Sequence, residues 1–390
     1  MVKDDSRILN IGATVRSGNY WNFSTYITPI EEFYVRNHYP TPLASEKPIL
    51  AKENWKLKIH GPAVERPIEI GYEDLLKMPA RTIIATMECH GNGRSLFWEQ
   101  GGFTGDQVKG GNWVLGAIGQ AEWKYVPMSV ILDKVGVKPN AKTVLFWSGV
   151  DGTGDIGRPM PFADVVNLQN DMGVTYAMNG NPLTEDHGAP VRLVVPGWGG
   201  TASIKWLTEI KISDKRIWTR VNTKGECYIG PDYKAPEHAA DDEFLPGITP
   251  ADIKGPMVTW MPPKSLITVP LVLEKSPSHP ANYPLAKGQW PTMSAGKQTV
   301  NGYAWAPQHG VKMVEYRIDG GAWQKAAIRE PNLGKYTWVR FSFDWDAKAG
   351  KHEIETRTTD NSGVSQPETI PMNVLGMANW SIPKFKVEVI

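Results

Sequence analysis

The chain of 390 residues contains little cysteine, almost no net charge and no long apolar run. Its only cysteines are Cys89 and Cys227, which excludes a disulfide framework. The chain has 42 Lys and Arg residues and 41 Asp and Glu residues, so its net charge is +1. This balance favours neither nucleic acid nor a membrane surface as the partner. No apolar run approaches the roughly 20 residues that a membrane-spanning helix needs.

The first residues, 1–7, also lack the charged-then-apolar pattern of a signal peptide. Two compartments fit this start. The protein is cytoplasmic, or it is periplasmic and its leader is absent from this chain. We favour the periplasm, and two cysteines are compatible with either compartment.

Glycine and proline are plentiful, with 38 Gly and 31 Pro, and they favour short strands and loops over a helical bundle. The length allows two or three domains of roughly 150 residues each. Alternating apolar and polar residues predict a strand over 55–60, and a mostly apolar run predicts another over 82–87, which ends just before Cys89. The pattern 72–78 predicts a short helix that stops before Pro79.

Beyond a Pro-rich stretch at about 235–263, the pattern changes to alternating strands separated by turns. The clearest of these strands are 298–305, 312–318, 337–343 and 352–358. Such spacing is typical of an immunoglobulin-like β-sandwich. We therefore expect an α+β chain with a mixed, strand-rich domain over 1–250, followed by a linker and a sandwich over 251–390.

Cys89 stands in the polar, glycine-rich run Met-Glu-Cys-His-Gly-Asn-Gly-Arg, residues 87–94. A thiolate is a soft metal ligand and a nucleophile. The alternative is that Cys89 is a small buried hydrophobe. Three other segments are rich in Arg, His, Lys, Asn or hydroxyl groups, namely 34–40, 186–192 and 201–206. Cations and glycine-rich turns are what an anionic phosphate needs, so these segments suggest a phosphate-bearing cofactor beside a soft metal.

The chain resembles the sulfite oxidase family of molybdenum enzymes, in its bacterial, haem-free form. The cysteine motif is similar to the family's Cys-x-Gly-Asn turn. Further similar segments follow in the same order as in the family: 113–118 with Trp123, 176–180, 186–188, 196–198 and 204–207. The alternating C-terminal strands resemble the family's dimerisation domain. The resemblance implies a molybdopterin-binding domain followed by an immunoglobulin-like dimerisation domain, and a homodimer.

The resemblance also implies a molybdenum–molybdopterin cofactor, without haem, in which Cys89 is the only protein ligand of the metal. The residues implied to line the pterin or bind its phosphate are Tyr34, Val35, Arg36, Asn37, His38, Asp151, His187, Arg192, Ser203, Ile204 and Lys205. Arg36 and Arg94 would hold the substrate anion, and His90 would carry a proton. Two plainer interpretations remain open: Arg94 pairs with Glu99 at the surface, and His90 is hydrogen-bonded within its turn.

The family reaction oxidises sulfite to sulfate and passes electrons to an external acceptor, such as a cytochrome c or oxygen. This chain departs from the family pattern twice, since no tyrosine occurs over 151–162 and Leu375 replaces an arginine. Both changes affect the substrate side. Three alternatives therefore remain: an S- or N-oxide reductase, an oxidase of another sulfur compound, and a binding protein that has lost the metal.

Overall fold

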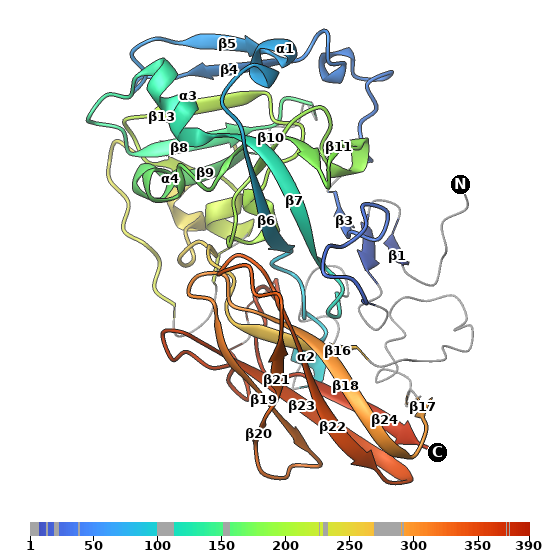
Figure 1. Ribbon diagram of the computed structural model, residues 1–390. Helices are drawn as coiled ribbons and strands as arrows, with labels where there is room; N and C mark the ends of the chain where they lie inside the picture. Colours follow the sequence, from blue (N-terminus) through green and yellow to red (C-terminus); the bar gives the residue numbers. More distant parts are fainter. Residues whose placement is uncertain are drawn as a thin grey trace. The chain divides into compact units, whose positions relative to one another are not determined.

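The structure is a computed structural model (Figure 1), and it describes residues 8–12, 15–18, 23–37, 40–99, 113–150, 157–225, 227–228, 233–268, 290, 292–371, 373 and 375–390. The chain divides into two compact units. Unit 1 comprises Met1–Arg36, Ile84–Ala121 and Trp260–Ile390, and unit 2 comprises Asn37–Ile83 and Glu122–Thr259. None of the unit boundaries falls between residues 250 and 251, where the sequence predicted a domain boundary. That boundary remains a prediction. In the described residues no helix combines the length and the apolar character needed to cross a membrane.

Unit 2 contains a mixed sheet in which β4 and β13 are parallel and the other neighbours are antiparallel. Its order is β5 (Ile68–Gly71), β4 (Lys56–His60), β13 (Glu209–Ser213), β8 (Thr143–Trp147) and β9 (Gly157–Pro161). On β4, the buried Leu57 and Ile59 alternate with exposed lysines, as the sequence pattern predicted. The helices of this unit are α1 (Tyr72–Leu76), α3 (Met128–Val135) and α4 (Phe162–Leu168).

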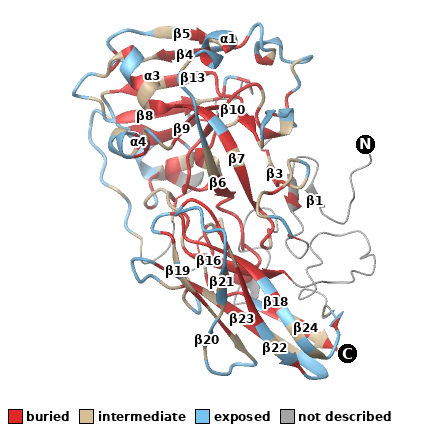
Figure 2. Ribbon diagram, in the orientation of Figure 1, coloured by how far each residue is buried: buried red, intermediate tan, exposed pale blue. Residues whose placement is uncertain are grey.

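A second sheet runs through both units. Its order is β11 (Asn181–Pro182), β10 (Gly173–Met178), β7 (Ile118–Pro127) and β6 (Arg81–Glu88), with β12 (Arg192–Val194) also paired to β10. β10 is buried along its whole length (Figure 2). Strands β6 and β7 continue from unit 2 into unit 1, so β6 delivers Cys89 to unit 1.

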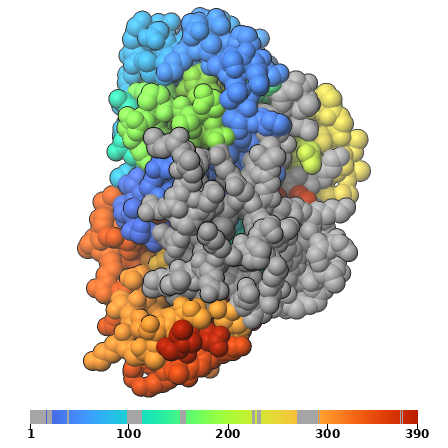
Figure 3. All heavy atoms as spheres, turned by 90° about the vertical axis from the view of Figure 1, so that its right-hand side faces the viewer, coloured from blue at the N-terminus to red at the C-terminus, as the bar shows by residue number. Residues whose placement is uncertain are grey.

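The C-terminal part of unit 1 is a sandwich of two sheets. One has the order β16 (Lys264–Thr268), β18 (Gly296–Trp305), β22 (Val339–Ala347), β21 (Ala327–Arg329). The other has the order β17 (Thr292–Met293), β24 (Lys384–Val389), β23 (Gly350–Asp360), β19 (Val311–Ile318), β20 (Gln324–Lys325). Tyr316 and Phe343 stack between the sheets with ring centroids 3.8 Å apart. In Figure 3 the C-terminal residues, in red, lie among the orange residues of this sandwich, where β24 pairs with β17 and β23. The predicted strand-rich α+β fold with a C-terminal sandwich is confirmed.

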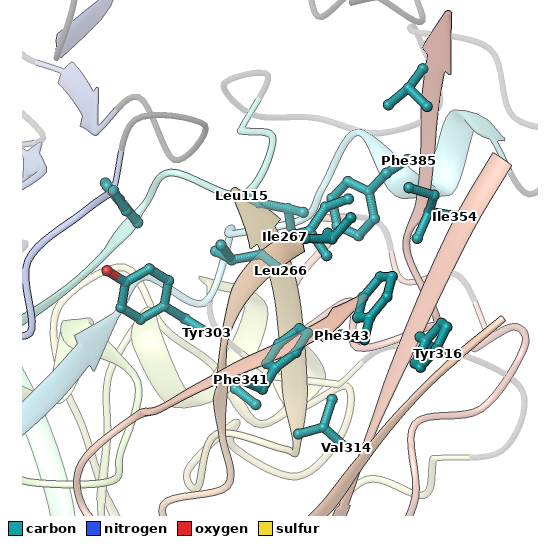
Figure 4. Close-up of a cluster of buried hydrophobic side chains, with 14 of the residues drawn as sticks. Leu115, Leu266, Ile267, Tyr303, Val314, Tyr316, Phe341, Phe343, Ile354 and Phe385 are labelled. Atoms are coloured by element: carbon teal, nitrogen blue, oxygen red, sulfur yellow. The ribbon is translucent and has the colours of Figure 1, made fainter. Parts of the chain in front are cut away.

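The core of the sandwich also includes residues from the segment that follows Cys89. Leu96, Leu115 and Ile118 belong to the same buried apolar cluster as Ile267 and Phe385. Figure 4 shows Leu115 beside the side chains of the sandwich. The apolar contacts therefore attach the Cys89 segment to the sandwich.

The remaining described elements are short. They are the antiparallel strands β1 (Ile8–Gly12), β2 (Val15–Gly18) and β3 (Val35–Arg36), the parallel pair β14 (Ile217–Trp218) and β15 (Glu243–Phe244), the helix α2 (Leu96–Glu99), the 3-10 turns η2 (Pro48–Leu50), η3 (Glu185–His187), η4 (Gly200–Ala202) and η6 (Pro250–Asp252), and the π-helical turn η5 (Val221–Gly225). Among these, β3, η3 and η4 position predicted site residues.

Candidate active site

Cys89 begins a tight turn between β6 and α2, and only 8% of the residue is exposed. Its backbone N–H donates to the carbonyl of Ala117 at 2.9 Å, and its own carbonyl accepts from the N–H of Asn92 at 2.9 Å. Both backbone groups of the cysteine are therefore fixed. The thiol is held at a defined place in unit 1, as a metal ligand requires.

The rest of the turn pairs with the segment 113–117. The N–H of Gly93 donates to the carbonyl of Val114 at 2.5 Å, and the N–H of Ala117 donates to Asn92 Oδ1 at 3.0 Å. Gly93 has φ +83, a conformation that favours glycine, and a Cβ there would lie 3.1 Å from the carbonyl oxygen of Asn379. The glycine in this motif is therefore required by the backbone and by close packing.

A buried polar cluster lies under the turn. Glu88 is 1% exposed, and its carboxylate accepts from Lys264 Nζ at 2.6 Å, from Trp305 Nε1 at 2.7 Å and from Asn92 Nδ2 at 2.9 Å. Sequence reasoning missed this cluster. The available signal was a charged residue at the end of an apolar strand, Glu88, and another at the start of one, Lys264.

Residues 375–378 contact the turn through hydrogen bonds. The N–H of Ala378 donates to the carbonyl of His90 at 2.6 Å, and Arg94 Nε donates to the carbonyl of Leu375 at 2.8 Å. Arg94 Nη2 also lies 3.6 Å from Met377 Sδ. His90 is fully buried and Arg94 is 5% exposed. Leu375, which replaces the family's arginine, thus contributes its carbonyl to Arg94, and Met377 contributes its thioether.

Tyr34, Val35 and Arg36 lie in unit 1 as well, at and just before β3. The Tyr34 ring stands edge-on to Trp113 with centroids 6.3 Å apart, and the carbonyl of Trp113 accepts from the N–H of Ser95 at 3.0 Å. This chain of contacts connects β3 to the Cys89 turn. The predicted site residues that belong to unit 1 are Tyr34, Val35, Arg36, Cys89, His90 and Arg94.

In unit 2, Asn37 and Lys205 form a polar network with the turn at η3. Lys205 Nζ donates to Asn37 Oδ1 at 2.7 Å and to the carbonyl of Asp186 at 2.5 Å. Thr41 completes the network, since its hydroxyl accepts from Asn37 Nδ2 at 2.8 Å and donates to Asp186 Oδ1 at 2.7 Å. Residues more than 160 positions apart in the sequence thus meet around one ammonium group.

Arg192 links two loops of unit 2. Its guanidinium donates to the carbonyl of His187 at 3.0 Å and to the carbonyl of Ser203 at 2.8 Å. Ser203 Oγ accepts from the N–H of Val195 at 3.0 Å, and the carbonyl of Ile204 accepts from the N–H of Leu193 at 2.8 Å. The loops that begin at η3 and η4 are therefore joined through β12. The predicted residues gathered in unit 2 are Asn37, His187, Arg192, Ser203, Ile204 and Lys205.

Two predicted site residues, His38 and Asp151, lie outside the described residues, as does part of the segment that lacks the expected tyrosine. Of the two arginines that were considered as a replacement cation, Arg158 donates to the carbonyl of Val258 at 3.0 Å and is fully buried. Arg340 donates to the carbonyl of Glu330 at 3.1 Å on the sandwich. The roles assigned to individual site residues remain predictions.

The donor groups of unit 2 fit a hydrogen-bonding, anionic cofactor. Trp198, 2% exposed, lies between β12 and η4, and its indole N–H has no acceptor among the described residues. A buried donor without a partner costs roughly 1–3 kcal/mol, which a bound acceptor would recover. Lys205 supplies a cation in the same unit. In unit 1, Cys89 supplies a thiol whose deprotonated form is a soft metal ligand.

Two family models match this chain. Residues 42–220 match the family model of the oxidoreductase molybdopterin binding domain, and residues 281–390 match that of the Mo-co oxidoreductase dimerisation domain. Mitochondrial sulfite oxidase from Drosophila melanogaster is 28% identical over 94% of this chain, and NADH nitrate reductase from Solanum lycopersicum is 29% identical over 93%. This chain spans 60% and 38% of those two relatives.

A solved structure is similar over nearly the whole chain. The sulfane dehydrogenase SoxCD from Paracoccus pantotrophus is 27% identical and has a TM-score of 0.74. The match covers 96% of this chain and 85% of that one. The similarity therefore includes both the molybdopterin binding domain and the dimerisation domain.

Proposed function

Because the chain belongs to the sulfite oxidase family of molybdenum oxidoreductases, we propose that it oxidises sulfite to sulfate and passes the electrons to an external acceptor. Sulfite and water give sulfate, two protons and two electrons. The acceptor, a cytochrome c or oxygen, takes the electrons. The observation that supports this most is the buried Cys89 turn with Arg94 folded back over it.

The molybdenum–molybdopterin cofactor supplies oxygen-atom transfer and uptake of two electrons when it is bound. Cys89 would be the protein ligand of the metal. Arg94 and Arg36 would attract and orient the substrate anion, and His90 would hold a proton near it. Lys205 and the Trp198 indole N–H are suited to anionic or acceptor groups of the cofactor.

Oxidation of a sulfane-sulfur compound is a second candidate, and a specific observation favours it. The carbonyl of Leu375 and the Met377 thioether contact Arg94, and Leu375 stands where the family pattern has an additional arginine. A charge-assisted hydrogen bond contributes roughly 1.5–3 kcal/mol, and its loss lowers affinity for a dianion about tenfold or more. A thioether and a leucine suit a larger, softer substrate. SoxCD is a sulfane dehydrogenase by name.

The test is a metal analysis combined with an acceptor assay. We expect about one molybdenum per chain and reduction of ferricyanide or cytochrome c that depends on sulfite. A parallel assay with glutathione persulfide tests the second candidate, and reduced viologen with methionine sulfoxide or nitrate tests the reverse direction. Acceptor that stays oxidised at every sulfite concentration, with molybdenum-replete protein, would reject sulfite oxidation.

The C-terminal module supports a further part of the proposal. Residues 281–390 match the family model of a dimerisation domain. We therefore include a homodimer in the proposed function.

A further inference from the structure

The polar cluster under the Cys89 turn is built from four residues that are each 2% exposed or less. We name Glu88, Asn92, Lys264 and Trp305 the turn anchor. Lys264 Nζ donates to Glu88 Oε1 at 2.6 Å and to the carbonyl of Asn92 at 2.9 Å. Trp305 Nε1 donates to Glu88 Oε2 at 2.7 Å, and Asn92 Nδ2 donates to Oε1 at 2.9 Å. Both carboxylate oxygens of Glu88 therefore accept hydrogen bonds, and the turn is bonded on either side of Cys89, at Glu88 and at Asn92.

A buried ion pair such as Glu88–Lys264 is not needed for stability alone. Lys264 and Trp305 are the end residues of β16 and β18, which pair directly with each other in the sandwich. Removing two charges from water is costly, and apolar residues of similar size often stabilise such a position equally well. A buried ion pair is instead well suited to fix one geometry, because both partners are strongly directional.

The geometry that the anchor fixes is that of the cysteine. Glu88 is the residue before Cys89, and Asn92 accepts the N–H of Ala117 through its side chain. Ala117 in turn accepts the N–H of Cys89, and Asn92 donates its own N–H to the Cys89 carbonyl. These bonds form a closed loop around the turn, so a shift of Glu88 would move the Cys89 backbone.

We propose that Glu88 is a positioning residue that aims the Cys89 sulfur at the metal, and that Lys264 and Trp305 make the C-terminal sandwich part of that geometry. The inference rests on the proposed role of Cys89 as molybdenum ligand. It assigns to the sandwich a task beyond dimerisation, since two of its strands brace the ligand turn.

The experiment uses the full-length holoenzyme with the double substitution Glu88→Gln and Lys264→Met. This pair removes both charges with little change of shape, so it leaves no unpaired buried charge. Glutamine has one acceptor oxygen for the two remaining donors, Trp305 Nε1 and Asn92 Nδ2, so we expect a somewhat lower melting temperature. The molybdenum content should stay close to wild type. The Mo(V) electron paramagnetic resonance signal, generated with dithionite in the absence of substrate, should be shifted and broadened. Because supporting residues of metal ligands affect activity about 10–100-fold, kcat should fall by that factor while KM changes little.

A matched control removes a different ion pair of the same sandwich. Arg317 and Glu355 join β19 and β23, with Arg317 Nε donating to Glu355 Oε2 at 2.5 Å. The double substitution Arg317→Met and Glu355→Gln should leave the Mo(V) signal and kcat as in wild type, whatever it does to the melting temperature.

Trp305→Phe serves as the second variant if the double variant does not fold. It deletes one donor to Glu88 and keeps the aromatic ring, and we expect a smaller shift of the same Mo(V) signal. Wild-type signals in both anchor variants would overturn the inference and leave the ligand assignment intact. A wild-type enzyme that binds no molybdenum would overturn the proposed function, and the inference with it.

Discussion

The guanidinium of Arg94 packs directly over Gly91. A Cβ at Gly91 would lie 2.6 Å from Arg94 Nη2 and 3.0 Å from Cζ. The absence of a side chain at this position is therefore what allows the Arg94 guanidinium to fold back over the Cys89 turn. The motif glycine acts here through the space it leaves for Arg94.

Gly91→Ala should move this cation without unfolding the protein. Overpacking costs roughly 1–3 kcal/mol, and displacing a charged donor should raise KM for sulfite about tenfold with a smaller effect on kcat. Steady-state kinetics and thermal unfolding measure the two effects. Arg94→Lys is the comparison, since it changes the cation without overpacking and should also raise KM. An unchanged KM in Gly91→Ala would remove Arg94 from substrate binding.

A second prediction at this scale concerns His352 on the sandwich. The hydrogen bond to Asp319, 2.7 Å long, raises the pKa of His352 above its ordinary value of 6.5. A raised folded-state pKa stabilises the protein below pH 6.5, and this contribution is lost as pH rises through the folded-state pKa. Asp319→Asn should therefore lower the melting temperature near pH 5.5 and change it little at pH 9.

Asn is a suitable replacement, because Asp319 has φ 50 and asparagine tolerates that conformation. Its side-chain oxygen also preserves the acceptor for the N–H of Glu353. A melting-temperature difference that stays constant from pH 5.5 to 9, or grows with pH, would contradict the assigned cause.

Among the elements, strand β12 connects the loops that begin at η3 and η4 in unit 2. Arg192 on this strand donates to carbonyls on both loops, one at His187 and one at Ser203. A lysine has no planar fork and cannot reproduce both bonds. Arg192→Lys should leave a buried carbonyl without a donor and destabilise the protein by about 1–3 kcal/mol. Urea unfolding measures this loss, and a change below about 0.5 kcal/mol would reject the assigned bonds.

Local patterns predicted the elements well, because periodicity and turn residues act over short distances. The strand expected over 82–87 is β6, Arg81–Glu88, and the helix expected over 72–78 is α1, Tyr72–Leu76. The pairing of Glu88 with Lys264 could not be predicted in this way, because 176 positions separate them. The residues around Glu88 do not indicate that Lys264 will be buried beside it, and the residues around Lys264 do not indicate Glu88.

The residues expected at the site were found through motif resemblance, and the structure gathers them into two groups, one in each unit. Asn37, Lys205 and Asp186 meet in unit 2, whereas the Cys89 turn belongs to unit 1. Sequence motifs could not indicate that the segment after Cys89 packs with the sandwich. That outcome depends on Leu96, Leu115 and Ile118, whose apolar contacts are made with strands far along the chain.

At the scale of the whole molecule, the C-terminal module predicts self-association. Sedimentation equilibrium of the holoenzyme should give twice the 43.3 kDa mass of the chain. The expectation rests on residues 281–390, which match a dimerisation domain. A protein that remains at the single-chain mass at micromolar concentration would contradict it.

The central claim is that the Cys89 thiolate binds molybdenum, and X-ray absorption at the molybdenum edge tests it most directly. The measurement counts the sulfur atoms around the metal in wild type and in Cys89→Ser. Since serine offers oxygen in place of sulfur, we predict that the variant keeps its fold and pterin, loses one sulfur neighbour at the metal and loses turnover. An equal number of sulfur neighbours in both proteins, with turnover retained, would contradict the assignment.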